Sequence, residues 1–111
     1  MSTPAEPVRI DETYDSREVV VHAHQLVELL LKENPTTGFR WELRENGAPA
    51  CALREDTFLA PATGGVGRGG THRWLFEAVE TGTSPITLVY RRAWESKPPE
   101  RTVRFTVRVT P

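Results

Sequence analysis

Apolar and polar residues alternate along much of this chain with a period of two. In residues 103–109, valine or phenylalanine fills every second position, and arginine or threonine fills each position between them. Because successive side chains of a strand point to opposite faces, this pattern predicts a strand with one buried face. The same period predicts strands over residues 25–32, 39–44, 73–78 and 86–91. The apolar content of 25–32 would also suit a short helix, but its length and the following Pro35 favour a strand.

Weaker patterns complete the set of predicted elements. They predict strands over 8–12 and 17–23, and one or two short strands within 50–59. Turn-forming residues separate the strands at 14–16, 45–47 and 81–85. Seven or eight short strands with turns between them, and no convincing helix, predict an all-β sandwich.

The composition limits the classes of function. A chain of 111 residues fits one domain, which we expect at 8–111 after a flexible tail at 1–7. The formal net charge is −1 and the sequence pI is about 6.3, so a nucleic-acid partner is not expected. Nine prolines and eight glycines suit a domain with many turns rather than a helical bundle.

No apolar run reaches the ~18 residues of a membrane span, so we expect no membrane partner. The N-terminus has neither the basic nor the apolar region of a secretory signal. The chain as given is therefore expected in the cytoplasm, or outside the cell if a signal was removed. Cys51 is the only cysteine, so no intrachain disulfide can form. We expect a monomer that unfolds cooperatively and carries no cofactor.

Three isolated features give weak chemical signals. His22 and His24 would share one face of a strand and could bind a metal, but no third ligand is evident nearby. Cys51 has no base tied to it by a motif, which favours a small core residue over a nucleophile. Residues 65–70 have G-x-G-x-x-G spacing, yet a strand follows where a dinucleotide site needs a helix.

The most informative stretch is residues 34–41, Asn-Pro-Thr-Thr-Gly-Phe-Arg-Trp, between two predicted strands. Pro35 fixes its own φ and Gly38 permits a positive φ, so the stretch begins with a short shaped loop that presents two threonines. A tight turn without a task is the alternative on local chemistry alone. We expect Trp41 to anchor the core.

Two further loops join predicted strands. Residues 61–71 hold five glycines, whose backbone can approach a partner closely. Residues 91–95 carry arginine and tryptophan together, the side chains most often found at interface hot spots. We expect Trp94 to be exposed, because it follows the end of its strand among charged and proline residues.

A sandwich brings alternate loops to the same end, so the three loops predict one binding edge. None of them offers a matched acid and base, a nucleophile with a partner, or a metal set. We therefore expect a binding protein and not an enzyme.

The three loops, in this order on an all-β pattern, resemble those of the chagasin-type inhibitors of papain-like cysteine peptidases. Residues 34–39 (loop 1) look like the family's first inhibitory loop, residues 66–70 (loop 2) like its glycine-rich loop, and residues 90–95 (loop 3) like its third loop. The resemblance covers almost the whole chain from about Val8. Ala93 stands where the family commonly has proline, which leaves loop 3 less pre-organised and predicts weaker or differently tuned affinity.

The resemblance implies an immunoglobulin-like β-sandwich that inhibits the peptidase reversibly and without a covalent bond, its three loops filling the active-site cleft. Thr36 and Thr37 would lie over the catalytic cysteine and histidine. Trp94 would pack beside that histidine, and Arg92 would offer charged hydrogen bonds. The implied peptidase-binding residues are Asn34, Pro35, Thr36, Thr37, Gly38, Phe39, Val66, Gly67, Arg68, Gly69, Gly70, Arg92, Ala93 and Trp94. The competing hypothesis is an immunoglobulin-like binding or adhesion module for another protein or a carbohydrate.

Overall fold

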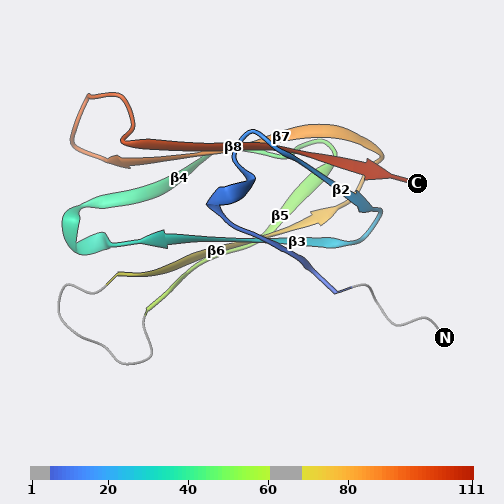
Figure 1. The fold of residues 1–111 in the computed structure, drawn as a ribbon, viewed down its shortest axis with the longest axis horizontal. Helices are drawn as coiled ribbons and strands as arrows, with labels where there is room; N and C mark the ends of the chain where they lie inside the picture. Colours follow the sequence, from blue (N-terminus) through green and yellow to red (C-terminus); the bar gives the residue numbers. More distant parts are fainter. Residues whose placement is uncertain (1–5, 61–68) are drawn as a thin grey trace.

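The structure is a computed structural model that describes residues 6–60 and 69–111. In these residues, eight strands form two four-stranded sheets that pack face to face (Figure 1), which confirms the predicted all-β sandwich. One sheet has the order β1-β3-β6-β5 and the other has the order β2-β8-β7-β4. The strands are β1 (Val8–Ile10), β2 (Glu18–His22), β3 (Leu26–Glu33), β4 (Phe39–Asn46), β5 (Cys51–Leu59), β6 (Gly70–Ala78), β7 (Gly82–Arg92) and β8 (Arg101–Thr110).

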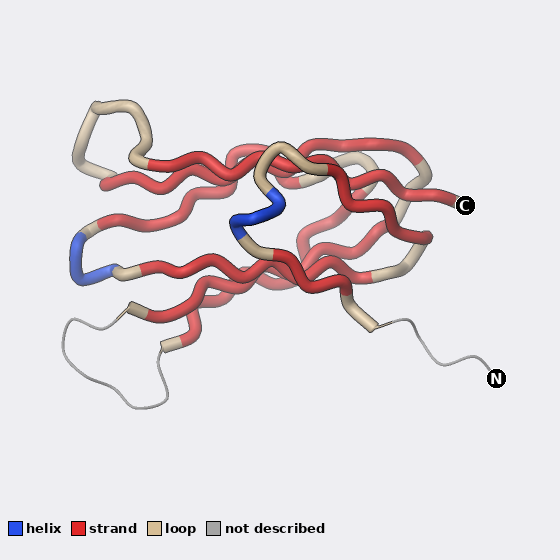
Figure 2. Tube along the Cα trace, viewed as in Figure 1, coloured by secondary structure: helices blue, strands red, loops and turns tan. Residues whose placement is uncertain are grey.

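Two short 3₁₀ turns, η1 (Glu12–Tyr14) and η2 (Pro35–Thr37), lie outside the strands, and the other described residues form loops (Figure 2). No helix in the described part of the chain is long and apolar enough to cross a membrane.

The core lies between the two sheets and is built from the alternating apolar positions. All four apolar positions of the 103–109 pattern are buried on β8, as predicted. Trp74, Phe76 and Phe105 are the largest fully buried side chains, and Trp41 is also buried. Cys51, the one cysteine of the chain, is a free buried thiol, so no disulfide within the chain stabilises the fold. The main stabilising contribution is therefore the removal of apolar surface from water.

The predicted turn at 81–85 is wrong, because β7 begins at Gly82 and residues 82–85 pair with 106–109 of β8. Pro85 fits in this strand because its carbonyl points away from β8 and accepts a hydrogen bond from the Gly47 N–H at 3.0 Å. The backbone nitrogen of Pro85, which carries no hydrogen, also faces away from β8. It lies beyond Ile86, the last β7 residue that pairs with β4, so no hydrogen bond between β7 and β8 is lost.

The histidine pair also differs from the prediction. Strand β2 ends at His22, and His24 lies in a turn with a φ of 71°. The two side chains therefore do not share a strand face. Within residues 6–60 and 69–111, no group of three or more histidine, cysteine or acidic side chains is arranged to hold a metal ion.

The last residues of β3, β5 and β7 and the first residues of β4, β6 and β8 gather at one end of the sandwich, on the left of Figure 1. Strands β3, β5 and β7 all run toward this end, since each is antiparallel to a strand that leaves it. The β3–β4 connection crosses from one sheet to the other through η2. The β5–β6 hairpin belongs to the first sheet and the β7–β8 hairpin to the second. The topology therefore places loop 1 between the ends of the two hairpins.

Candidate binding site at the loop end

Loop 1 is a single 3₁₀ turn closed by its own hydrogen bonds. The Oδ1 atom of Asn34 accepts from the Thr36 N–H at 3.2 Å and from the Thr36 hydroxyl at 2.6 Å. The Thr37 hydroxyl donates to the Asn34 carbonyl at 2.7 Å. A proline occupies the first position of the turn, and Gly38 ends it with a φ of 83°. The local sequence therefore favours this turn: Asn34 caps its start, proline suits its first position, and glycine allows the positive φ at its end.

The threonines of loop 1 present acceptors rather than donors to the solvent. Thr36 and Thr37 are both exposed. Each hydroxyl proton already points to an oxygen of Asn34. The Thr37 hydroxyl oxygen also accepts from the Phe39 N–H at 3.4 Å, so one of its two lone pairs remains for a partner, beside those of Thr36. The loop thus offers two fixed acceptors to the donors of a binding partner.

Loop 3 ends in a tight turn that exposes its tryptophan. The Glu95 N–H donates to the Arg92 carbonyl at 3.1 Å, which closes a four-residue turn. Trp94 is 73% exposed, as predicted, yet its ring lies against Gly38 of loop 1. A Cβ atom added to Gly38 would lie 2.9 Å from Cζ2 of Trp94 and closer still to Cη2. Gly38 is therefore required both by its positive φ and by the space that the Trp94 ring occupies.

Arg92 joins loop 3 to loop 1. Its Nε donates to the Thr37 carbonyl at 2.9 Å, and its guanidinium lies 4.3 Å from the centre of the Phe39 ring. Phe39 in turn stacks on Tyr90 with ring centres 5.2 Å apart. The Tyr90 hydroxyl accepts from the Asn34 N–H at 3.2 Å. These contacts hold loops 1 and 3 together as one body, which we call the wedge (residues 34–39 and 90–95).

Loop 2 is described only at its end. Val66, Gly67 and Arg68 lie outside the described residues, so their role stays a prediction. A Cβ atom on Gly69 would lie 3.3 Å from Cβ of Asn34, so the end of loop 2 reaches the start of loop 1. Gly70 is not a loop residue, because it begins β6, where a side chain would overlap β5.

Two residues behind the wedge were missed by the sequence analysis. Glu33 and His72 are buried, and Oε1 of Glu33 lies 3.0 Å from Nδ1 of His72. Oε2 of Glu33 accepts from the Trp41 N–H at 2.6 Å. The sequence did contain a signal, since both residues fall on the apolar side of the period-two pattern of their strands.

Cys51 is confirmed as a core residue. It is only 3% exposed, and burial raises the pKa of its thiol to about 11 because the thiolate loses water. A thiol held in its protonated form is a poor nucleophile, so an enzyme built on Cys51 is not supported.

Comparisons with known proteins decide the family. The family model for the chagasin family peptidase inhibitor I42 matches residues 20–109. The chain belongs to the chagasin family of peptidase inhibitors. Chagasin of Trypanosoma cruzi is 29% identical over 103 residues, which cover 89% of this chain and 93% of that protein. The resemblance inferred from the three loops is therefore confirmed, and the family is one of inhibitors rather than enzymes.

Solved structures share the fold of this chagasin-family chain. The crystal structure of the cysteine protease inhibitor EhICP2 from Entamoeba histolytica matches with a TM-score of 0.82 and 24% identity, over 95% of this chain and 96% of that one. PbICP-C, solved in complex with falcipain-2, matches with a TM-score of 0.66 and 11% identity, over 96% of this chain and 100% of that one. At these identities the likeness shows the fold alone.

Proposed function

We propose that this chain is a reversible, non-covalent inhibitor of papain-like cysteine peptidases that acts as a monomer and places its loop end in the active-site cleft. The observation that carries the proposal is that loops 1 and 3 are joined into one exposed wedge before any partner binds. The relatives support the class of target, since EhICP2 is a cysteine protease inhibitor and PbICP-C binds falcipain-2.

The shape of loop 1 explains how it can occupy a cleft without being cut. A peptidase substrate lies extended, with its carbonyl aimed at the nucleophile. In loop 1 the Thr37 N–H donates to the Asn34 carbonyl at 3.2 Å, and the Gly38 N–H donates to the Pro35 carbonyl at 2.9 Å. An extended path would break both bonds and the Asn34 cap, so the near-attack geometry is not reached.

The wedge offers two kinds of contact. The Thr36 and Thr37 hydroxyl oxygens accept hydrogen bonds from donors in the cleft. Trp94 offers an exposed aromatic ring, the side chain most enriched at interface hot spots. Because Arg92 already fixes loop 3 to loop 1, little conformational entropy is lost when the wedge docks.

The first experiment is a titration of papain, and of a cathepsin-L-like enzyme, with the purified protein at low enzyme concentration. We expect stoichiometric loss of activity, with the inhibitor intact afterwards on a gel. Trp94→Ala and Thr37→Val should weaken inhibition while the fold is retained. The matched control is Val79→Ala, another exposed apolar residue, at the opposite end of the sandwich, which should inhibit like the wild type.

Two outcomes would contradict the proposal. One is the absence of inhibition of either enzyme at micromolar protein, and the other is full inhibition by the Trp94 and Thr37 variants. The first result would favour an immunoglobulin-like module for another protein or a carbohydrate, and the second would show that inhibition does not depend on the wedge.

A further inference from the structure

A row of three ionisable side chains crosses the first sheet behind loop 1. Glu33 on β3, His72 on β6 and Asp56 on β5 come from neighbouring strands. Nδ1 of His72 lies 3.0 Å from Oε1 of Glu33, and Nε2 of His72 contacts Oδ1 of Asp56. The Glu33 side chain is fully buried and the His72 side chain is 11% exposed. Buried ionisable groups of this kind are costly unless they are paired, so the row demands a physical account.

Glu33 ties this row to the two ends of loop 1. It is the last residue of β3 and directly precedes Asn34. Its Oε2 accepts from the Trp41 N–H at 2.6 Å, on the strand that leaves the loop. The Trp41 indole N–H also donates to the Lys32 carbonyl at 2.9 Å. Glu33 therefore holds the entering and leaving strands of loop 1 together, across the gap between the two sheets.

The ring of His72 can satisfy both carboxylates only when it is charged. A neutral imidazole has one N–H donor and one lone pair, whereas the imidazolium has two donors. If His72 loses a proton, one ring nitrogen directs a lone pair at a carboxylate oxygen. Among the described residues, the other charged group paired with Glu33 is Arg40 of β4, whose Nε lies 4.0 Å from Oε1. Trp74 stacks on the His72 ring with centres 4.0 Å apart, which shields one ring face from water.

We propose that Glu33 and His72 are positioning residues for loop 1, and that the protonation of His72 sets how firmly the loop is held. The inference rests on the proposed function, because loop 1 is the part that enters the cleft. The charged form of His72 stabilises the contact with Glu33. Loop 1 is therefore held more firmly when His72 is charged than when it is neutral, so its hold should weaken with rising pH.

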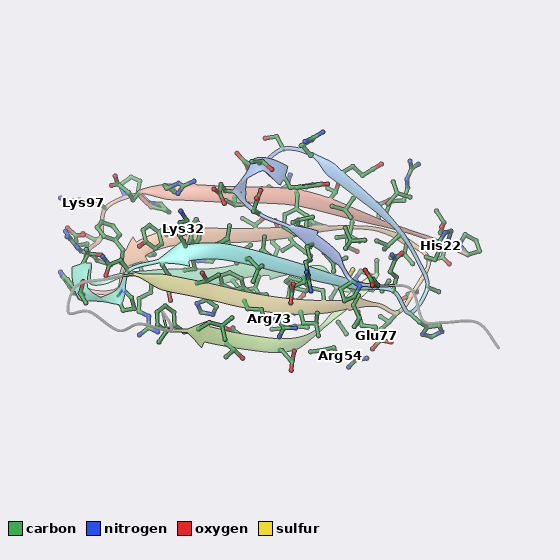
Figure 3. All side chains as sticks on the ribbon, turned by 60° about the horizontal axis from the view of Figure 1, so that its bottom comes forward. His22, Lys32, Arg54, Arg73, Glu77 and Lys97 are labelled. Carbon is green, nitrogen blue, oxygen red and sulfur yellow. The ribbon has the colours of Figure 1, made fainter. Side chains whose placement is uncertain are left out.

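The first test uses the free protein and needs no peptidase. Nuclear magnetic resonance would follow the His72 ring protons and the Trp41 amide between about pH 5 and pH 8, where histidines change charge. We expect both signals to move with the same midpoint. The control is His22→Gln, a histidine at the opposite end of the molecule from Lys97 of the β7–β8 connection (Figure 3). This control should leave the Trp41 titration unchanged.

Two variants separate positioning from simple stability. In His72→Asn, the amide nitrogen can replace Nδ1 as a neutral donor to Glu33, and the group does not titrate. In Glu33→Gln, an amide oxygen can still accept from the Trp41 N–H, but the carboxylate is gone. Both should abolish the movement of the Trp41 amide with pH. Two results would overturn the proposal: a Trp41 amide signal that does not move with pH in the wild type, or one that moves with pH in a folded His72→Asn variant. If the variants do not fold, the wild-type result decides alone.

The second test measures inhibition constants of the wild type and of His72→Asn against one peptidase at about pH 5.5 and about pH 8. The pH dependence of the enzyme itself cancels in the ratio of the two constants. We expect the wild type to lose about tenfold in affinity relative to the variant at the higher pH, the effect of one weakened charged hydrogen bond. A constant ratio would overturn the link to inhibition. If the wild type inhibits at neither pH, the proposed function fails, while the amide titration still decides whether His72 positions the loop.

Discussion

Gly38→Ala tests whether loops 1 and 3 act as one wedge. The substitution adds a single methyl group at a residue whose φ is 83°. The backbone cost of placing alanine in this left-handed region is about 1–2 kcal/mol. The added atom would also lie 2.9 Å from Cζ2 of Trp94 and closer to Cη2, so the ring must move.

The two costs should appear in different measurements. Because Trp94 is 73% exposed, its ring can swing into solvent, and the free energy of unfolding should fall only by the backbone cost. The affinity for a cysteine peptidase should fall further, because the displaced ring no longer meets its site. Loss of a hot-spot tryptophan costs about 2 kcal/mol or more, so we expect about 30-fold weaker inhibition.

The assay pairs inhibition constants with chemical denaturation for each variant. Gly82→Ala is the matched control, since Gly82 also has a positive φ, of 142°, and an added Cβ would meet nothing within 4 Å. It should lose stability without losing affinity. In the Trp94→Ala background, Gly38→Ala should cost little further affinity, because the ring it displaces is already absent. Losses of affinity that simply add in the double variant, or an unchanged inhibition constant in Gly38→Ala, would refute the reasoning.

Three more predictions concern loop 3 and the core. Ala93→Pro should tighten inhibition several-fold in the same assay. Ala93 is the second residue of the turn closed by Glu95, where proline is favoured, and it lacks a positive φ. Proline should therefore save about 0.4–1 kcal/mol of the entropy that is lost when the loop is ordered. Arg92→Lys should raise the inhibition constant about tenfold with little change in the melting temperature, because lysine replaces neither the Nε bond to Thr37 nor the stack on Phe39; an unchanged constant would show that the wedge does not need this contact. Cys51 should resist thiol reagents in the native protein, and unfolding measurements should show stability falling between about pH 9 and about pH 11, because the unfolded chain releases the thiol proton first; Cys51→Ala should lack this fall.

The sequence by itself determined the features that depend on near neighbours. The period-two pattern identified the strands and their buried faces, because side-chain direction in a strand alternates regardless of what packs on it. The shape of loop 1 was also local, since the Asn34 cap, the proline and Gly38 act within five residues. The exposed position of Trp94 followed from the charged and proline residues around it.

Only the tertiary structure decided features that depend on strand order and register. Residues 82–85 have the composition of a turn, yet they form a strand because β8 pairs with them and β4 does not reach Pro85. The bond from Arg92 to Thr37 joins residues 55 positions apart, and the contact of Glu33 with His72 joins residues 39 apart. No local pattern specifies such partners, because the order and register of the strands within each sheet set which strand ends meet.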